Sequence, residues 1–157
     1  MITVFTCEDQ FDDMMTCIYD AWASRLGHSN VRLLTEPLGT PELFCTYRHV
    51  DAQPEKAESI ARTIRQKISR RAFQMVCRAA MSDQDDKLDA IYRFLNLGFY
   101  VGASVTDCLQ HPAVMRLFEL DRKVSNEAHY FKEFIRFASY ENRVLVSHIE
   151  PKSNVLS

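Results

Sequence analysis

The sequence predicts an α+β fold in which a small, mostly antiparallel sheet of about four strands packs with four or five helices. Three observations indicate it. Alternating, β-branched segments lie towards both ends of the chain, amphipathic helical segments fill most of the space between them, and one central segment is apolar on nearly every side. The length of 157 residues, with few Gly and Pro, predicts a single domain over 1–157.

The first third of the chain is expected to supply three strands and one helix. Residues 2–7 alternate and are β-branched, which is typical of a strand. An acidic pair then opens a helix that includes Trp22, which we expect to pack in the core rather than stack on a base. Residues 31–36 and 42–50 are predicted to be two strands joined by a turn that contains proline and glycine.

The middle of the chain is predicted to be helical. Pro54 fits a first helical turn, and an apolar stripe continues from there to Ala79, as one long helix or as two with a break near Ser69. The next helix, from about Lys87 to Gly102, is apolar on most sides. We therefore expect it to be the central element of the core.

The last quarter of the chain is predicted to contain one more helix and one more strand. The helix begins at Pro112 and should end within 139–142. Residues 143–150 then alternate as a fourth strand, which Pro151 ends.

Charge is distributed unevenly along the chain. Residues 1–58 hold four Lys or Arg and ten Asp or Glu, whereas residues 59–82 hold six basic residues and no acid. The six are Arg62, Arg65, Lys67, Arg70, Arg71 and Arg78. Four of them, Lys67, Arg70, Arg71 and Arg78, have the spacing of one helical side, opposite the apolar stripe. Because guanidinium groups make paired, charge-assisted hydrogen bonds to phosphate, the six are candidate nucleic-acid-binding residues. The alternative is a solvated face that pairs with acids elsewhere in the chain.

A second polar face lies on the predicted last helix. Its members recur at helical spacing and are Arg122, Asn126, His129, Glu133 and Arg136. His129, oriented by Glu127 or Glu133, is a candidate catalytic acid or base. The alternative is a chain of ion pairs on a helix surface.

No metal site or cofactor is predicted. The five histidines lack paired ligand spacing, and the five cysteines contain no CxxC motif. No apolar run approaches the roughly 20 residues that span a bilayer, and the N-terminus does not have the features of a signal peptide. We therefore expect a cytoplasmic protein with reduced thiols and no membrane partner.

Five segments resemble a bacterial family described as a "probable DNA metabolism protein", which is a domain of unknown function. They are TCEDQFDDMMTCIYDAWASRLG, KISRRAFQMVCRAA, DAIYRFLNLGF, VMRLFELDRKVSNEAHYFKEFIRF and HIEPKSNVL. The family pattern falls on Arg122, Glu127, Ala128, His129, Phe134, Arg136, Phe137, Glu150 and Pro151. Members of that family usually continue beyond the last of these segments, so this chain is expected to correspond to their N-terminal part.

The resemblance implies a role in DNA repair or modification. It implies a radical-SAM protein as a partner, and relatives are fused to a uracil-DNA glycosylase domain. Three functional hypotheses follow. The chain is an accessory domain that holds DNA phosphate through its Arg-rich helix while a partner enzyme does the chemistry. Alternatively, it is an enzyme that processes nucleotides or nucleic acid with His129, or an adapter that docks on the radical-SAM partner without touching DNA.

Overall fold

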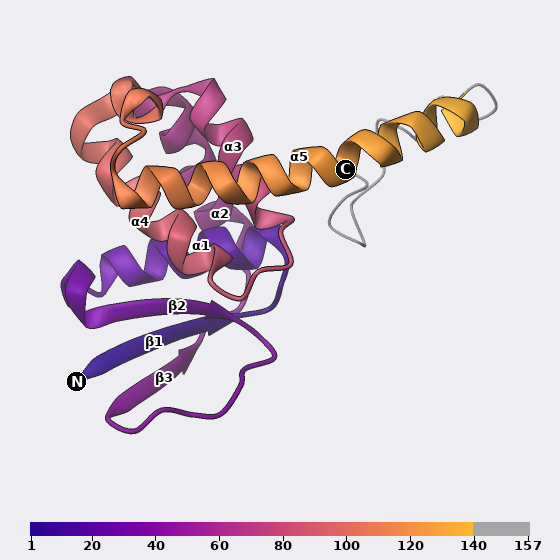
Figure 1. Ribbon diagram of the computed structural model, residues 1–157. Coiled ribbons are helices and arrows are strands. Elements are labelled where there is room, and N and C mark those ends of the chain that lie inside the picture. The colour runs from indigo at the N-terminus through magenta and orange to yellow at the C-terminus, as the bar shows by residue number, and fades with distance from the viewer. Residues whose placement is uncertain (140–157) are drawn as a thin grey trace.

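The computed structural model describes residues 1–139, with side chains up to residue 127. The described elements, in chain order, are β1 (Ile2–Cys7), α1 (Phe11–Ala23), the 3₁₀ turn η1 (His28–Asn30), β2 (Val31–Thr35), β3 (Cys45–His49), α2 (Pro54–Thr63), the π-helical turn η2 (Ile64–Ile68), α3 (Arg70–Ala80), α4 (Lys87–Val101), the 3₁₀ segment η3 (Gly102–Asp107) and α5 (Pro112–Ser139). The fold is α+β, and the five α-helices of this part of the chain gather on one side of the sheet (Figure 1).

The sheet differs from the prediction. Within the described residues it has three strands, all parallel, in the order β2-β1-β3. The expected mostly antiparallel sheet of about four strands is therefore wrong. In the register, Phe5 of β1 lies between Leu33 of β2 and Arg48 of β3. The expected fourth strand, 143–150, falls outside the described residues.

The expected turn between the second and third strands is a crossover instead. Residues 36–44 are long enough to return past a strand, since a chain of that length reaches about 30 Å and a short strand spans about 17 Å. Glu42 anchors the crossover to both outer strands: its carboxylate accepts two hydrogen bonds of 2.9 Å from Arg32, and its N–H donates to the Tyr47 hydroxyl at 2.9 Å. The crossover therefore delivers β3 parallel to β2, with β1 between them.

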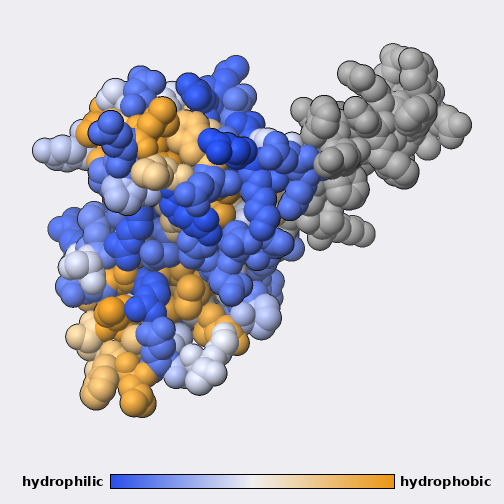
Figure 2. Space-filling model, viewed as in Figure 1, coloured by the Kyte–Doolittle hydropathy of each residue, from blue (hydrophilic) through white to orange (hydrophobic). Residues whose placement is uncertain are grey.

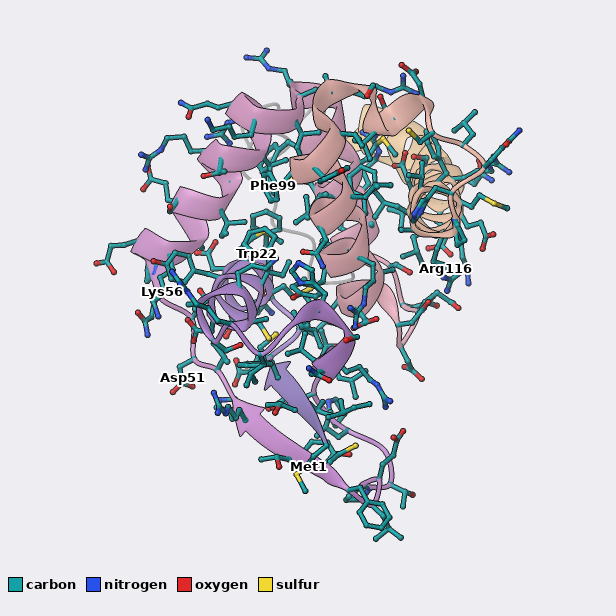
Figure 3. All side chains as sticks on the ribbon, turned by 90° about the vertical axis from the view of Figure 1, so that its left-hand side faces the viewer. Met1, Trp22, Asp51, Lys56, Phe99 and Arg116 are labelled. Carbon is teal, nitrogen blue, oxygen red and sulfur yellow. The ribbon has the colours of Figure 1, made fainter. Side chains whose placement is uncertain are left out.

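The core lies between the sheet and the helices, and α4 is its central element, as predicted. Four side chains of α4 are completely buried: Leu88, Ile91, Phe94 and Leu95. Trp22 of α1 packs against this core, with its ring 5.0 Å from that of Phe99 and its Nε1–H donating to Asn96 at 2.6 Å (Figure 3). The expectation for Trp22 is confirmed.

A buried lysine connects two loops at the carboxyl end of β1. Lys87 is 2% exposed, and its Nζ donates to Asp9 Oδ1 at 2.5 Å and to the carbonyls of Ala80 and Ser82 at 2.9 Å each. A buried ammonium group is stable only when it is paired and hydrogen-bonded, as here. The contacts fix the segment between α3 and α4 against the segment between β1 and α1.

The basic segment folds as two helical stretches that meet at Ser69, so of the two alternatives that the sequence left open, the one with a break is observed. α2 runs into η2, and Ser69 then adopts an extended backbone with φ −172° and ψ 165°. Its hydroxyl accepts a hydrogen bond of 3.0 Å from the N–H of Ala72, which caps the N-terminus of α3. η2 stays anchored because Ile64 and Ile68 are buried in the core.

Candidate functional site

Five of the six predicted cations form an exposed basic surface. Arg62 lies at the end of α2, Arg65 and Lys67 on η2, and Arg70 and Arg71 in the first turn of α3; all five side chains are exposed. Nitrogen-tipped side chains accordingly project from the outer side of these helices in Figure 3. Among the described side chains, no carboxylate forms an ion pair with any of the five. We call these five residues the basic surface.

The break at Ser69 decides how these cations are arranged. Lys67 and Arg70 belong to different helical segments, so the basic surface follows a bend and is not one side of a straight helix. Arg70 and Arg71 occupy the first turn of α3, which contains no acidic residue. The positive end of the helix dipole disfavours cations there by about 0.3–1 kcal/mol each, whereas an anion between them is favoured by both the helix and the arginines.

Arg78 differs from the other five cations because it has a carboxylate partner. Its guanidinium group forms a two-point contact with Asp121 of α5, through Nε–H to Oδ1 and through a terminal N–H to Oδ2 at 3.4 Å. This pair joins α3 to α5. Arg78 is therefore neutralised within the molecule, and we leave it out of the basic surface.

Two aromatic rings position members of the basic surface without neutralising them. The guanidinium group of Arg65 lies 4.8 Å from the ring centre of Phe73, and that of Arg71 lies 5.9 Å from the ring centre of Phe118. Cation–π contacts of this kind hold a guanidinium group in place and leave its N–H donors available. The sequence contains no signal for the Arg71–Phe118 contact, because it joins helices that are far apart in the chain.

A surface hollow of about 340 Å³ adjoins Phe118. Its lining residues are Leu109, Met115, Phe118, Glu119 and Arg122. Leu109 and Met115 are 56% and 48% exposed, which is unusual for such apolar side chains. Figure 2 shows hydrophobic surface among hydrophilic residues in the region of η3 and the beginning of α5. We call this feature the α5 hollow.

The second polar face is described only in part. Arg122, Asn126 and Glu127 are exposed on α5, and Arg122 makes no ion pair with another described side chain. The side chains of His129, Glu133 and Arg136 fall outside the described side chains. The catalytic role of His129 therefore stays a prediction. Arg122 belongs both to this face and to the α5 hollow.

A polar cluster at the carboxyl edge of the sheet was not expected from the sequence, because its members come from three separate segments. His49 Nδ1 lies 2.5 Å from Glu36 Oε2 and its Nε2 lies 2.9 Å from Asp51 Oδ1, while Thr6 donates to Glu36 at 2.8 Å. Glu36 and then Asp51 raise the pKa of His49, and His49 in turn lowers the pKa of Glu36. Because a carboxylate lies beside each ring nitrogen, the imidazolium form of His49 is favoured.

Three further features of the described part of the chain concern metal binding, membrane crossing and a cysteine nucleophile. This part contains no group of three or more His, Cys, Asp or Glu side chains arranged to hold a metal ion. No helix in it combines the length and the apolar character that crossing a bilayer requires. Cys7, a conceivable nucleophile at the end of β1, is 0% exposed, so a substrate does not reach its thiol.

Comparison with known family models gives a match over the last part of the chain. Residues 85–157 match the family model of a domain of unknown function, DUF4130. The matched region contains α4, the α5 hollow and the second polar face, whereas the basic surface lies before it. No curated protein and no solved structure matches the chain.

Proposed function

We propose that the chain is a nucleic-acid-binding accessory domain of DNA metabolism, linked to repair or modification, that works with a partner enzyme. The observation that carries the proposal is the basic surface: five exposed cations for which the described side chains offer no carboxylate. The sequence resemblance to a DNA-metabolism family supports DNA as the polyanion. A radical-SAM protein is the partner that this resemblance suggests.

DNA binding by exposed cations is driven largely by counterion release. Each phosphate that a Lys or Arg neutralises releases condensed cations, so affinity falls as salt rises. Cations that are already paired within the protein contribute little to this effect. The basic surface should contribute strongly, because no described carboxylate pairs with its five cations. The bend at Ser69 presents these cations along a curved path, and Arg70 and Arg71 add the N-terminus of α3 as a phosphate position.

Replacing both Arg70 and Arg71 by alanine tests the proposal. We expect DNA affinity to fall roughly 10- to 100-fold near 0.1 M salt, and the slope of log affinity against log salt to flatten by about one for each arginine removed. Fluorescence anisotropy with a labelled duplex would measure both. The matched control is Arg25→Ala with Arg48→Ala, which makes the same charge change at exposed positions outside the basic surface. Equal losses in the two double variants would show that only net charge matters and would contradict a defined surface.

A second candidate function is a protein-interaction adapter, and one observation favours it. Met1, Leu43 and Phe44 are 84%, 84% and 81% exposed where β1 and β3 begin, and hydrophobic surface gathers at that end of the sheet in Figure 2. Apolar side chains exposed together are typical of protein contact sites. Co-purification with the radical-SAM partner, with and without nuclease treatment, distinguishes the two functions. The adapter function would be supported if the partner co-purifies with the chain after nuclease treatment and no longer does so with the Leu43→Ser, Phe44→Ser variant.

A further inference from the structure

We propose that the α5 hollow receives an unpaired base of single-stranded nucleic acid, so that the basic surface and the hollow form one binding track. This inference rests on the proposed nucleic-acid function and specifies the kind of strand that is bound. Four features of the hollow support it: its apolar floor, its unpaired cation, its contact with the basic surface, and its size.

The floor of the hollow is apolar and accessible. Leu109 and Met115, which line it, are each about half exposed, and the third apolar lining residue, Phe118, packs against the core. A nucleobase offers a flat, weakly polar face that suits such a floor, because stacking against apolar and aromatic side chains tolerates any base. In a duplex that face is covered by neighbouring base pairs. The apolar floor is therefore useful only to a strand whose bases are free.

The rim of the hollow favours an anion attached to that base. Glu119 is the one acidic residue in the lining, and Arg116 already pairs with it at 2.9 Å. Arg122 is exposed and has no carboxylate partner among the described side chains. A ligand that combines a flat apolar part with a negative charge complements this lining, and a nucleotide within a strand is such a ligand.

Arg71 connects the hollow to the basic surface. It belongs to the basic surface through α3, and its guanidinium group lies 5.9 Å from the centre of the Phe118 ring, which lines the hollow. A strand held by Arg70 and Arg71 would thus lie beside the hollow that Phe118 and Arg122 line. The volume of about 340 Å³ is at the lower end of the roughly 300–1,000 Å³ of small-molecule pockets, which fits one planar group.

The test compares two labelled oligonucleotides that carry the same number of phosphates. One is oligothymidylate, and the other is a strand of abasic sites, which has the backbone and no bases. We expect the whole chain to bind oligothymidylate roughly tenfold more tightly, because stacking adds to phosphate binding. Leu109→Ala with Met115→Ala should remove this preference and leave the salt slope unchanged. Both residues are exposed, so the variant is expected to fold, and Leu43→Ala with Phe44→Ala is the matched control at another exposed apolar site.

Each outcome has a defined meaning. Equal affinity for the two oligonucleotides, or a preference that survives Leu109→Ala with Met115→Ala, overturns the base site and leaves the phosphate-binding function intact. No affinity for either strand at low salt overturns the proposed function and this inference together. Binding of an acidic, hydrophobic peptide that requires Leu109 and Met115, without binding of either strand, assigns the hollow to a protein partner and also overturns the inference.

Discussion

At the scale of single residues, the difference between Arg71 and Arg78 shows what makes a cation available for a ligand. Both belong to α3 and both contact α5, but Arg71 lies over the ring of Phe118, whereas Arg78 meets the carboxylate of Asp121. A ring attracts the guanidinium group and cancels none of its charge, while a carboxylate cancels it. Among the described side chains, Arg71 therefore keeps a charge that is available to an anion, whereas Arg78 joins α3 to α5.

The Glu36–His49–Asp51 cluster leads to a pH-dependent prediction. Because its carboxylate partners raise the pKa of His49, the stabilisation that His49 contributes is fully present below its unfolded-state pKa of about 6.5 and is lost as pH rises through the higher folded-state pKa. We expect His49→Gln to lower the free energy of unfolding more at pH 6 than at pH 9. Urea denaturation of the wild type and of His49→Gln at pH 6 and pH 9 would measure this difference in the free energy of unfolding.

The control for this prediction is His111→Gln, because His111 accepts a hydrogen bond from the N–H of Ala113 and no carboxylate among the described side chains pairs with it. The difference in free energy of unfolding between His111→Gln and the wild type should not change in the same way between pH 6 and pH 9. If His49→Gln lowers the free energy of unfolding equally at pH 6 and at pH 9, the cluster does not raise the pKa of His49.

The exposed cations of the basic surface could be predicted from the sequence, but the ion pair of Arg78 and the α5 hollow could not. The exposure of Arg62, Arg65 and Lys67 was predictable, since the apolar stripe of the same helix has to face the core. The pairing of Arg78 with Asp121 was not predictable, because it depends on how α3 and α5 pack. The α5 hollow was missed for the same reason, since it combines α5 with the segment before it.

At the scale of elements, helices could be predicted from local pattern and strand pairing could not. The helix break at Ser69 has a local cause in its capping hydroxyl, and the burial of α4 follows from its nearly uniform apolar character. The direction of β3 depends instead on the path of residues 36–44. Proline and glycine in that segment indicated a turn, but the segment crosses the sheet, where Glu42 contacts Arg32 of β2 and Tyr47 of β3.

The capping role of Ser69 gives a prediction for the element that carries Arg70 and Arg71. Ser69→Ala removes the acceptor for the Ala72 N–H, so the free energy of unfolding should fall by about 1 kcal/mol. Ser59→Ala is the control, because Ser59 lies inside α2 and caps no helix; we expect a change within about 0.5 kcal/mol. Thermal and urea denaturation would measure both. Equal effects of the two substitutions would contradict a capped break between η2 and α3.

At the scale of the whole molecule, charge is distributed unevenly. The formal net charge is −2, yet the basic surface contains no acid, and acidic side chains gather at the carboxyl edge of the sheet. There, burial first and then Glu8, Asp12 and Asp51 raise the pKa of Asp13. A polyanion that approaches such a molecule is attracted to one surface and repelled from the other. If the chain binds DNA as we propose, the basic surface is therefore the part expected to face it despite the acidic total.

The most direct test of this account is the affinity of the wild-type chain for DNA, titrated against salt. If the five cations of the basic surface each neutralise one phosphate, log affinity should fall linearly with log salt, with a slope of roughly −3.5 on single strands to −4.5 on duplex. A chain that shows no affinity for DNA at low salt, or an affinity that salt does not change, would contradict the account.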